Sequence, residues 1–220
     1  MRIQGNETVE RKENTFKNLL AGSDTFVITC EHIPGRASRD KKLDEIVAFA
    51  AKCRETGLVH ALSLTDNPSG APAIAPDVMA REIEQAGLPV IVHFAAKDMN
   101  RNMIESRALS LDRMDVRNLL VMSGDYPVSG FQGRPAPVFD LDPIHTLQLI
   151  SNMNRGLAYP GIKGAVTHQP SDFFPGAVVS PFKATESEQV GQYDKLKKKI
   201  DAGAKFIVTQ LGYDARKFHE

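Results

Sequence analysis

Short runs of apolar residues alternate along the chain with longer segments in which apolar residues recur every three or four positions. The central run, Leu119–Met122, holds four apolar residues between Asn118 and the sequence Ser123-Gly124-Asp125. It is too short for a helix and is closed by a glycine, so it predicts a strand that is buried on both faces. Asp125 then places a carboxylate just beyond the carboxyl end of that strand, where parallel-sheet and barrel enzymes keep their reacting groups.

The other apolar runs predict five further strands, and segments with helical periodicity lie between them. Lys41–Thr56 shows this periodicity most clearly, with apolar residues at positions i, i+3, i+4 and i+7 and with Gly57 at its end. The strands start about thirty residues apart, which is the length of one βα unit. The predicted strands are Phe26–Cys30, Leu58–Thr65, Pro89–Ala95, Phe174–Ser180 and Phe206–Gln210, and the next two helices are Pro76–Ala86 and Asn100–Arg113.

Two later helices are predicted from their first residues. Asp142 followed by Pro143 is typical of a helix start, with an N-cap and a proline at the first helical position. Thr185 and Glu188 have the spacing of a capping box, and the helix that they open is expected to end at Gly203. The stripe of this last helix that is expected to face inward is Val190, Tyr193, Leu196 and Ile200.

Three segments fall outside the alternation. Met1–Asn18 is polar and is expected to form a surface arm or a short helix. Pro127–Pro137 holds three prolines and two glycines and predicts a loop. Asn152–Asp172 is rich in glycine and proline and is expected to be an irregular insertion, and loops of this length are usually functional or mobile.

The predicted architecture is an α/β fold of the (β/α)8 TIM-barrel type, here an incomplete barrel of about six βα units in one domain, residues 1–220. A complete barrel needs eight units and about 250 residues. We therefore expect either a fragment of a longer barrel or one part of a barrel that a second chain completes. An open six-stranded sheet is the alternative, and it would leave two parallel edges to be covered.

Composition and charge favour a small-molecule partner. The 220 residues include 27 basic and 27 acidic side chains, a balance that indicates neither nucleic acid nor an anionic membrane surface as partner. Cys30 and Cys53 are the only cysteines, which is typical of reduced thiols in a cytoplasmic protein. The sequence has no apolar run approaching about 18 residues, so it predicts no membrane span and no signal peptide.

Polar side chains at the predicted strand ends are the candidates for chemistry. In a parallel barrel all carboxyl ends of strands meet at one mouth, so these side chains are expected to converge. Two carboxylates there could act as an acid and as a stabiliser of charge. The strand ends carry Glu31, Thr65, His93, Asp125, Ser180 and Gln210.

Each candidate also has a purely structural interpretation. Glu31 could be a solvated loop carboxylate, Asp125 could shape an Asx-turn, and His93 could be a buried histidine with satisfied hydrogen bonds. The lysines at 195 and 197–199 are by default a solvated helix face. Cys30, Glu31, His32 and His93 match no zinc spacing, and no Gly-x-Gly-x-x-Gly or Walker loop is present.

Five short blocks, in order along Phe26–Phe218, resemble the methylenetetrahydrofolate reductase family. The strongest is Asp-Ala-Gly-Ala-Lys-Phe-Ile-Val-Thr-Gln at the start of Asp201–Asp214, which is similar to that family's Asp-Ala-Gly-Ala-x-Phe-x-x-Thr-Gln. Ser123-Gly124-Asp125-Tyr126-Pro127 stands where the family has Arg-Gly-Asp-x-Pro. The other blocks are Glu31 after the first strand, Ser63-Leu64-Thr65 with Ser69-Gly70, and His93 in the third strand.

This resemblance implies a flavin-containing barrel that passes a hydride from NAD(P)H to flavin and then to methylenetetrahydrofolate, giving methyltetrahydrofolate. It implies that Glu31 is the general acid that helps to open the methylene bridge, that Asp125 lies between folate and flavin, and that Gln210 binds the pterin. The implied flavin, FAD in preference to FMN, would contact Thr65, His93, Ser123, Gly124, Asp125, Phe139, Asp140, Ser180 and Lys199, the last as a cation for the diphosphate.

Two departures from the family pattern lie among these positions: Ser123 replaces an arginine and Ser180 replaces a tyrosine. The alternative function is a non-catalytic folate-binding or accessory barrel subunit that serves a methyltransferase or an electron-transfer partner. A homo-oligomer, or a second chain that completes the barrel, is the expected protein partner.

Overall fold

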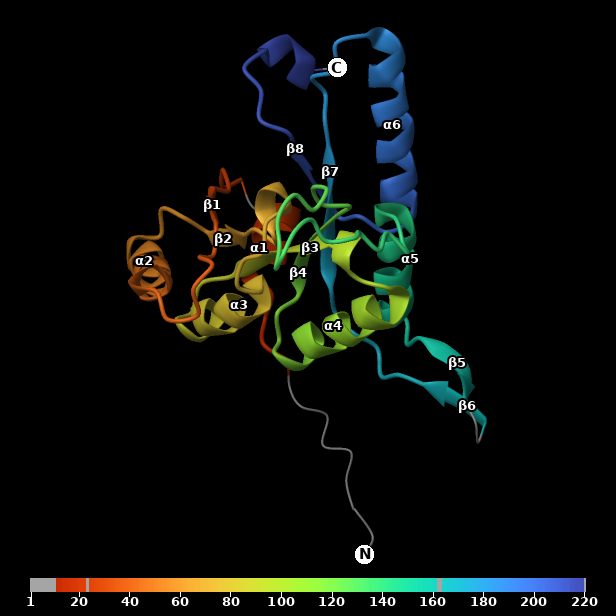
Figure 1. The fold of residues 1–220 in the computed structure, drawn as a ribbon. Coiled ribbons are helices and arrows are strands. Elements are labelled where there is room, and N and C mark those ends of the chain that lie inside the picture. Colours follow the sequence, from red (N-terminus) through yellow and green to blue (C-terminus); the bar gives the residue numbers. More distant parts are fainter. Residues whose placement is uncertain (1–10, 23, 162–163, 220) are drawn as a thin grey trace, which may run out of the picture.

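Six parallel strands form one curved sheet in the order β1-β2-β3-β4-β7-β8 (Figure 1). The structure is a computed structural model that describes residues 11–22, 24–161 and 164–219. Among these residues, β1 and β8 are the two edges of the sheet. The strands are β1 (Thr29–His32), β2 (Ala61–Leu64), β3 (Val90–Ala95), β4 (Asn118–Met122), β7 (Phe174–Val179) and β8 (Phe206–Thr209).

Among the described residues, five helices cover the outer face of the sheet, one after each of its first five strands, and several of their ends lie where the sequence predicts. α2 begins after Asp40, whose side chain accepts a hydrogen bond from the Lys42 amide, and it ends before Gly57 in the left-handed conformation. Both halves of the predicted capping box before α6 are formed. The helices are α2 (Lys41–Thr56), α3 (Pro76–Gln85), α4 (Arg101–Arg113), α5 (Pro143–Asn154) and α6 (Glu186–Asp201).

The four inner strands, β2, β3, β4 and β7, are buried on both faces, and their alternate side chains point to opposite sides of the sheet. On the outer side, Leu62, Val92 and Leu119 pack against the helices in the main core. On the inner side, Ile91 and Leu120 belong to a second, smaller core. This two-sided burial explains why the strands read as continuous apolar runs and not as an alternating pattern.

The inner core is closed at one side by α1 (Thr15–Gly22), from the segment expected to be a polar arm or short helix. Phe16 of α1 is only 2% exposed and meets the rings of Phe174 and Phe206 edge-on, with centroids 6.2 and 5.6 Å away. Residues 11–14 precede α1 and are anchored as well, since Asn14 donates a hydrogen bond to the Asn118 side chain. Residues 1–10 lie outside the described part of the chain.

The insertion between α5 and β7 is not irregular, so that prediction was wrong. Ala158–Gly161 (β5) and Gly164–Thr167 (β6) pair as an antiparallel hairpin, which stands away from the sheet beside α5 (Figure 1). Just after β6, His168 Nε2 lies 3.5 Å from Glu105 Oε1 of α4, a contact that ties the hairpin to the barrel. Two four-residue strands rich in glycine and proline carry too little alternation for a strand prediction, and their pairing is decided between segments.

The edge formed by α6 and β8 is less covered than the sequence predicts. Val190 and Ile200 of α6, expected to face inward, are each 51% exposed, so the prediction was wrong for these two residues. The helix packs on β7 and α5, and no strand in the described part of the chain pairs with the outer edge of β8, where Val208 is 41% exposed. An amphipathic stripe is buried only where a neighbouring element meets it.

Short 3₁₀ helices lie in the loops that follow three of the strands: η1 (Pro68–Gly70), η2 (Ala96–Asp98) and η3 (Ala215–Phe218). The parallel strands and the helices that alternate with them form an incomplete (β/α) barrel of the TIM type, so the predicted fold class is confirmed. All the loops that leave the carboxyl ends of the strands therefore lie at the same rim.

Candidate active site at the carboxyl ends of the strands

Glu31, Ser63 and His93 come from three neighbouring strands and meet on the inner side of the sheet. Glu31 was expected in the loop after the first strand, but it lies within β1, in register with Ser63 of β2. His93 Nε2 lies 2.8 Å from Ser63 Oγ and 3.8 Å from Glu31 Oε2. The predicted strand Phe26–Cys30 begins three residues before β1, because Phe26 is apolar and yet 86% exposed. Two of the strand-end candidates are thereby brought together.

His93 is an uncharged imidazole at neutral pH. Burial lowers its pKa to about 4, although the nearby Asp66 carboxylate acts in the opposite direction. Asp66 has its own cation, since its Oδ2 lies 2.6 Å from Nη1 of Arg107. The Glu31 side chain is 61% exposed, so a buried neutral ring faces a solvent-accessible carboxylate.

The Arg107 network is a feature that the sequence analysis missed. Arg107 of α4 also binds Asp77 of α3, with 2.6 Å between Nη2 and Oδ1, and its guanidinium carbon lies 4.8 Å from the centre of the Phe94 ring. Asp66 in turn accepts a hydrogen bond from the Ala95 amide at the end of β3. The network therefore locks the loop after β2 to the end of β3. No pattern in the sequence links these residues, which lie 11 to 41 positions apart.

Asp125 holds the loop after β4 to the loop after β2. Its Oδ2 accepts a hydrogen bond of 2.8 Å from the Ser69 amide, so the carboxylate reaches across to η1 and does not cap a turn of its own loop. Gly70 has a φ of +68°, and a Cβ there would lie 1.8 Å from the Tyr126 carbonyl oxygen. The two loops thus touch through backbone, which only glycine permits at this position.

Gly124 and Lys97 join the loops after β3 and β4. Gly124 has a φ of +87°, and a Cβ there would lie 3.0 Å from Lys97 Cδ. Lys97 is 1% exposed; its amide donates to the Ser123 carbonyl, and its carbonyl accepts from the amides of Val138 and Phe139. Lys97, which the sequence analysis missed, therefore positions Ser123 and Phe139, two of the predicted flavin contacts.

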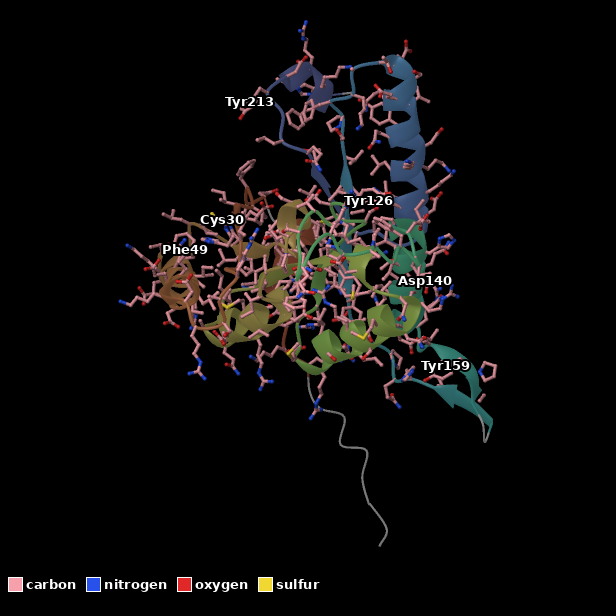
Figure 2. All side chains as sticks on the ribbon, in the orientation of Figure 1. Cys30, Phe49, Tyr126, Asp140, Tyr159 and Tyr213 are labelled. Atoms are coloured by element: carbon pink, nitrogen blue, oxygen red, sulfur yellow. The ribbon has the colours of Figure 1, made fainter. Side chains whose placement is uncertain are left out.

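Phe139 and Asp140 lie further along the loop after β4, and Asp140 is labelled in Figure 2. Phe139 has a φ of +45°, which is rare for a non-glycine residue, and its ring meets Tyr126 at 5.1 Å between centroids. Asp140 is bound by the Arg101 side chain and amide at 2.8 to 3.0 Å. Hydrogen bonds from Arg101 lower the pKa of Asp140 to about 2. Asp140 is thus a fixed anion that already has a cation.

Thr65 has a buried hydroxyl that no protein group binds. The residue is 6% exposed, and Oγ1 is one of two buried side-chain polar atoms without a hydrogen-bond partner among the described residues. Its amide donates to the His32 carbonyl. A buried hydroxyl without a partner costs free energy, so this position points to a ligand that supplies one.

The remaining candidates lie toward the β7 and β8 edge. Ser180 is partly buried, and its amide lies 3.4 Å from Gln192 Oε1. Lys199 of α6 donates a hydrogen bond of 2.6 Å to the Val178 carbonyl, and burial lowers its pKa. Gln210 follows β8, is exposed, and is held by its amide to the Val179 carbonyl at 2.9 Å. Figure 2 shows Tyr213, which follows this strand, far from Tyr126 and Asp140.

A sequence profile described as methylenetetrahydrofolate reductase matches residues 15–220, which include every helix and strand described above. The chain belongs to the methylenetetrahydrofolate reductase family. The family that the sequence resembles is thereby confirmed. A search of curated proteins found no match.

Among solved structures, the fold is similar to that of an uncharacterized protein from Clostridium thermocellum that binds two copies of 5-methyl-5,6,7,8-tetrahydrofolic acid. The TM-score is 0.57 and the sequence identity is 16%, a level at which the likeness concerns the fold alone. The alignment covers 93% of this chain and 60% of that protein, so the chain spans about three fifths of its neighbour's length.

The roles of the individual site residues stay predictions. The described residues include no group of three or more His, Cys, Asp or Glu side chains arranged to hold a metal ion. No helix in the described ranges is both long and apolar enough to cross a membrane.

A hollow of about 370 Å³ lies among the loops after β2, β3 and β4, next to Asn67, Lys97 and Phe131.

Proposed function

We propose that this member of the methylenetetrahydrofolate reductase family takes part in the flavin-dependent reduction of methylenetetrahydrofolate to methyltetrahydrofolate, with NAD(P)H as the hydride donor. The observation that carries the proposal is the exposed Glu31 carboxylate beside the buried neutral His93, inside the rim of a family barrel. The Clostridium thermocellum neighbour binds 5-methyl-5,6,7,8-tetrahydrofolic acid, the product of this reaction, which supports a folate as the substrate.

Glu31 is the proposed general acid. Opening the methylene bridge of the substrate requires a proton on the nitrogen that leaves the bridge carbon, and the product of that step is an iminium ion. Glu31 is accessible to a ligand from the rim, and the imidazole beside it carries no charge that would favour the carboxylate form. A cation at this distance would favour the carboxylate, so less of Glu31 would carry the proton that the reaction needs.

The positions predicted to contact flavin fit such a ligand in part. Among the described residues the buried hydroxyl of Thr65 has no hydrogen-bond partner, and Gly124 has no side chain at the point where the loops after β3 and β4 meet. A flavin bound there would supply hydride transfer between the nicotinamide and the folate. The protein would contribute Thr65, His93 and the 123–125 segment as contacts, with FAD preferred to FMN.

Asp125 and Gln210 are the proposed contacts that orient the substrate. Asp125 keeps one carboxylate oxygen on the Ser69 amide, which leaves the other oxygen able to accept from a ligand. Gln210 is exposed beyond β8, and its side-chain amide offers both a donor and an acceptor to the edge of a pterin ring. Both residues stand after parallel strands, at the same rim as Glu31.

The decisive experiment is an optical one on the purified protein. With FAD added, the proposal expects bound flavin absorbance that NADH or NADPH bleaches and methylenetetrahydrofolate restores. FMN in a parallel sample decides between the two flavins. A protein that binds folate but neither flavin would overturn the enzyme proposal.

That second outcome corresponds to the alternative, a folate-binding subunit without redox chemistry that serves a methyltransferase or an electron-transfer partner. One observation favours it: Lys199 and Asp140, two predicted flavin contacts, are already bound to Val178 and Arg101. A partner that completes the barrel, either a second copy or another chain, would cover the exposed Val190, Ile200 and Val208. Sedimentation analysis of the purified chain distinguishes a monomer from such an assembly.

A further inference from the structure

Ser63 lies on β2, between β1 and β3, and among the described residues its hydroxyl hydrogen-bonds to His93. Its hydroxyl lies 2.8 Å from Nε2 of His93, and both residues are 8% exposed. The same Nε2 atom is 3.8 Å from Glu31 Oε2, which is beyond a normal hydrogen bond. Two groups therefore lie within reach of a single ring nitrogen, and the serine is the one that binds it.

The charges around His93 come from three elements. Glu31 faces the ring from β1, and Asp66 approaches from the loop after β2. Arg107 of α4 neutralises Asp66 and lies 3.5 Å from the His93 carbonyl. On the β4 side the register partner of His93 is Leu120, which carries no charge. Glu31 is thus the carboxylate near the ring that no described cation neutralises within 4 Å.

We propose that Ser63 is a positioning residue that binds Nε2 of His93 and thereby prevents His93 from forming a charged pair with Glu31. The contact itself does not depend on the reaction. Its consequence for Glu31 as a proton donor rests on the function proposed above.

The chemistry of the three groups gives the reason. A carboxylate can only accept, so a hydrogen bond from His93 to Glu31 needs a proton on Nε2. A serine hydroxyl can donate, so it can bind the bare Nε2 of a neutral ring whose proton is on Nδ1. The hydroxyl could also accept from Nε2–H, and the proposal is that it donates. Donation by Ser63 and a hydrogen bond from Nε2 to Glu31 exclude each other, because Nε2 carries either a proton or a lone pair. With Ser63 as the donor, Glu31 remains free to give its proton to a ligand.

Removing the hydroxyl leaves Glu31 as the acceptor within reach of Nε2. The Nε2–H form then gains a carboxylate partner, and the imidazolium gains more because the pair becomes an ion pair. Burial lowers the pKa of His93 to about 4 in the intact protein, so a rise is readily detected. Glu31, held as a carboxylate, would protonate the substrate less well.

The test is a histidine NMR titration of the purified chain, with ¹⁵N-labelled imidazoles and with His93→Gln to assign the signal. Intact protein should show His93 with its proton on Nδ1 and no protonation above pH 5. Ser63→Ala should move the proton to Nε2 and raise the pKa of His93 by about one unit or more. Ser63→Thr, which keeps the hydroxyl, should behave as the intact protein does. Circular dichroism of each variant establishes that it is folded.

A double variant separates the proposal from a general disturbance of the site. In Ser63→Ala with Glu31→Gln, the pKa of His93 should return to its value in the intact protein, because the carboxylate that favoured the charged ring is gone. An unchanged tautomer and pKa in Ser63→Ala, or a raised pKa that persists in the double variant, would overturn the proposal. The titration needs neither flavin nor folate, so it stands if the proposed function fails.

Discussion

Arg107 of α4 and Asp66, the second residue after β2, form an ion pair with 2.6 Å between Nη1 and Oδ2. Both side chains are only 10% exposed, and Asp77 shares the same guanidinium. The pair lies directly behind His93, to whose backbone carbonyl Arg107 also approaches. The electrostatics of the candidate site therefore depend on a residue of the outer helix layer.

Replacing this arginine should destabilise the fold strongly. In Arg107→Met, the carboxylates of Asp66 and Asp77 lose their shared cation while remaining largely buried, and we expect a loss of about 3–5 kcal/mol in the free energy of unfolding. Urea titration followed by circular dichroism measures it. Arg101→Gln is the matched control on the same helix, because the Arg101–Asp140 pair is open to solvent, and it should change stability far less. Equal losses of unfolding free energy in the two variants would contradict the role of Arg107 as the shared cation of two buried carboxylates.

Glu84 should make the chain less stable in alkaline solution. Burial raises its pKa to about 7, while one carboxyl oxygen accepts a hydrogen bond from the Val90 amide. The folded protein thus binds a proton that the unfolded chain releases near its ordinary pKa of about 4.3, so this contribution to stability is complete below that pH and is lost as the pH rises through 7.

The measurement is the free energy of unfolding at pH 5 and pH 8 for the intact chain and for Glu84→Gln. The glutamine keeps an acceptor for the Val90 amide and cannot ionise, so the variant should be the more stable protein at pH 8, by up to about 3 kcal/mol. At pH 5 the difference should be much smaller. If the difference in unfolding free energy between the two proteins is the same at pH 5 and pH 8, the pKa of Glu84 is not raised.

Phe16 should contribute to stability well beyond what its place near the chain start suggests. The ring is 2% exposed and lies against Phe174 and Phe206 in the inner core. Phe16→Ala should cost about 3–5 kcal/mol, the usual range for such a truncation in a core. Phe131→Ala is the control, since Phe131 is 93% exposed, and it should stay within about 0.5 kcal/mol of the intact chain. A small effect of Phe16→Ala would mean that α1 does not close the inner core in solution.

Glu31→Gln should separate the two half-reactions of the proposed enzyme. Flavin reduction by NAD(P)H needs no proton from Glu31 and should continue at nearly the rate of the intact protein. Reduction of methylenetetrahydrofolate should slow by about 10²-fold or more, which is the usual scale of general acid catalysis. Stopped-flow absorbance of the flavin reports both steps, and Glu55→Gln on the exposed face of α2 serves as control. Parallel losses in both steps would remove the role assigned to Glu31.

The sequence predicted the parallel βα order, most helix ends and the family, because these depend on local signals. Apolar runs, Gly57, Asp142 and the Thr185–Glu188 box act within a few residues of the structure that they specify. Glu31 and His93 could be placed at one rim by the same reasoning, since parallel strands share their direction. The hairpin β5–β6 could not, because its pairing depends on contacts between segments with weak patterns.

What the sequence alone determined is therefore the succession of elements and the set of polar residues at the strand ends. Only the tertiary structure decided which of these residues touch: that Ser63 and not Glu31 binds His93, that Arg107 neutralises Asp66, that Asp125 spans to Ser69, and that Val190 and Ile200 stay exposed. The physical reason is the distance along the sequence over which each kind of interaction acts. Caps and periodicity act over a few residues, whereas hydrogen bonds, ion pairs and burial inside a barrel join side chains that lie tens of positions apart and depend on which neighbour is present.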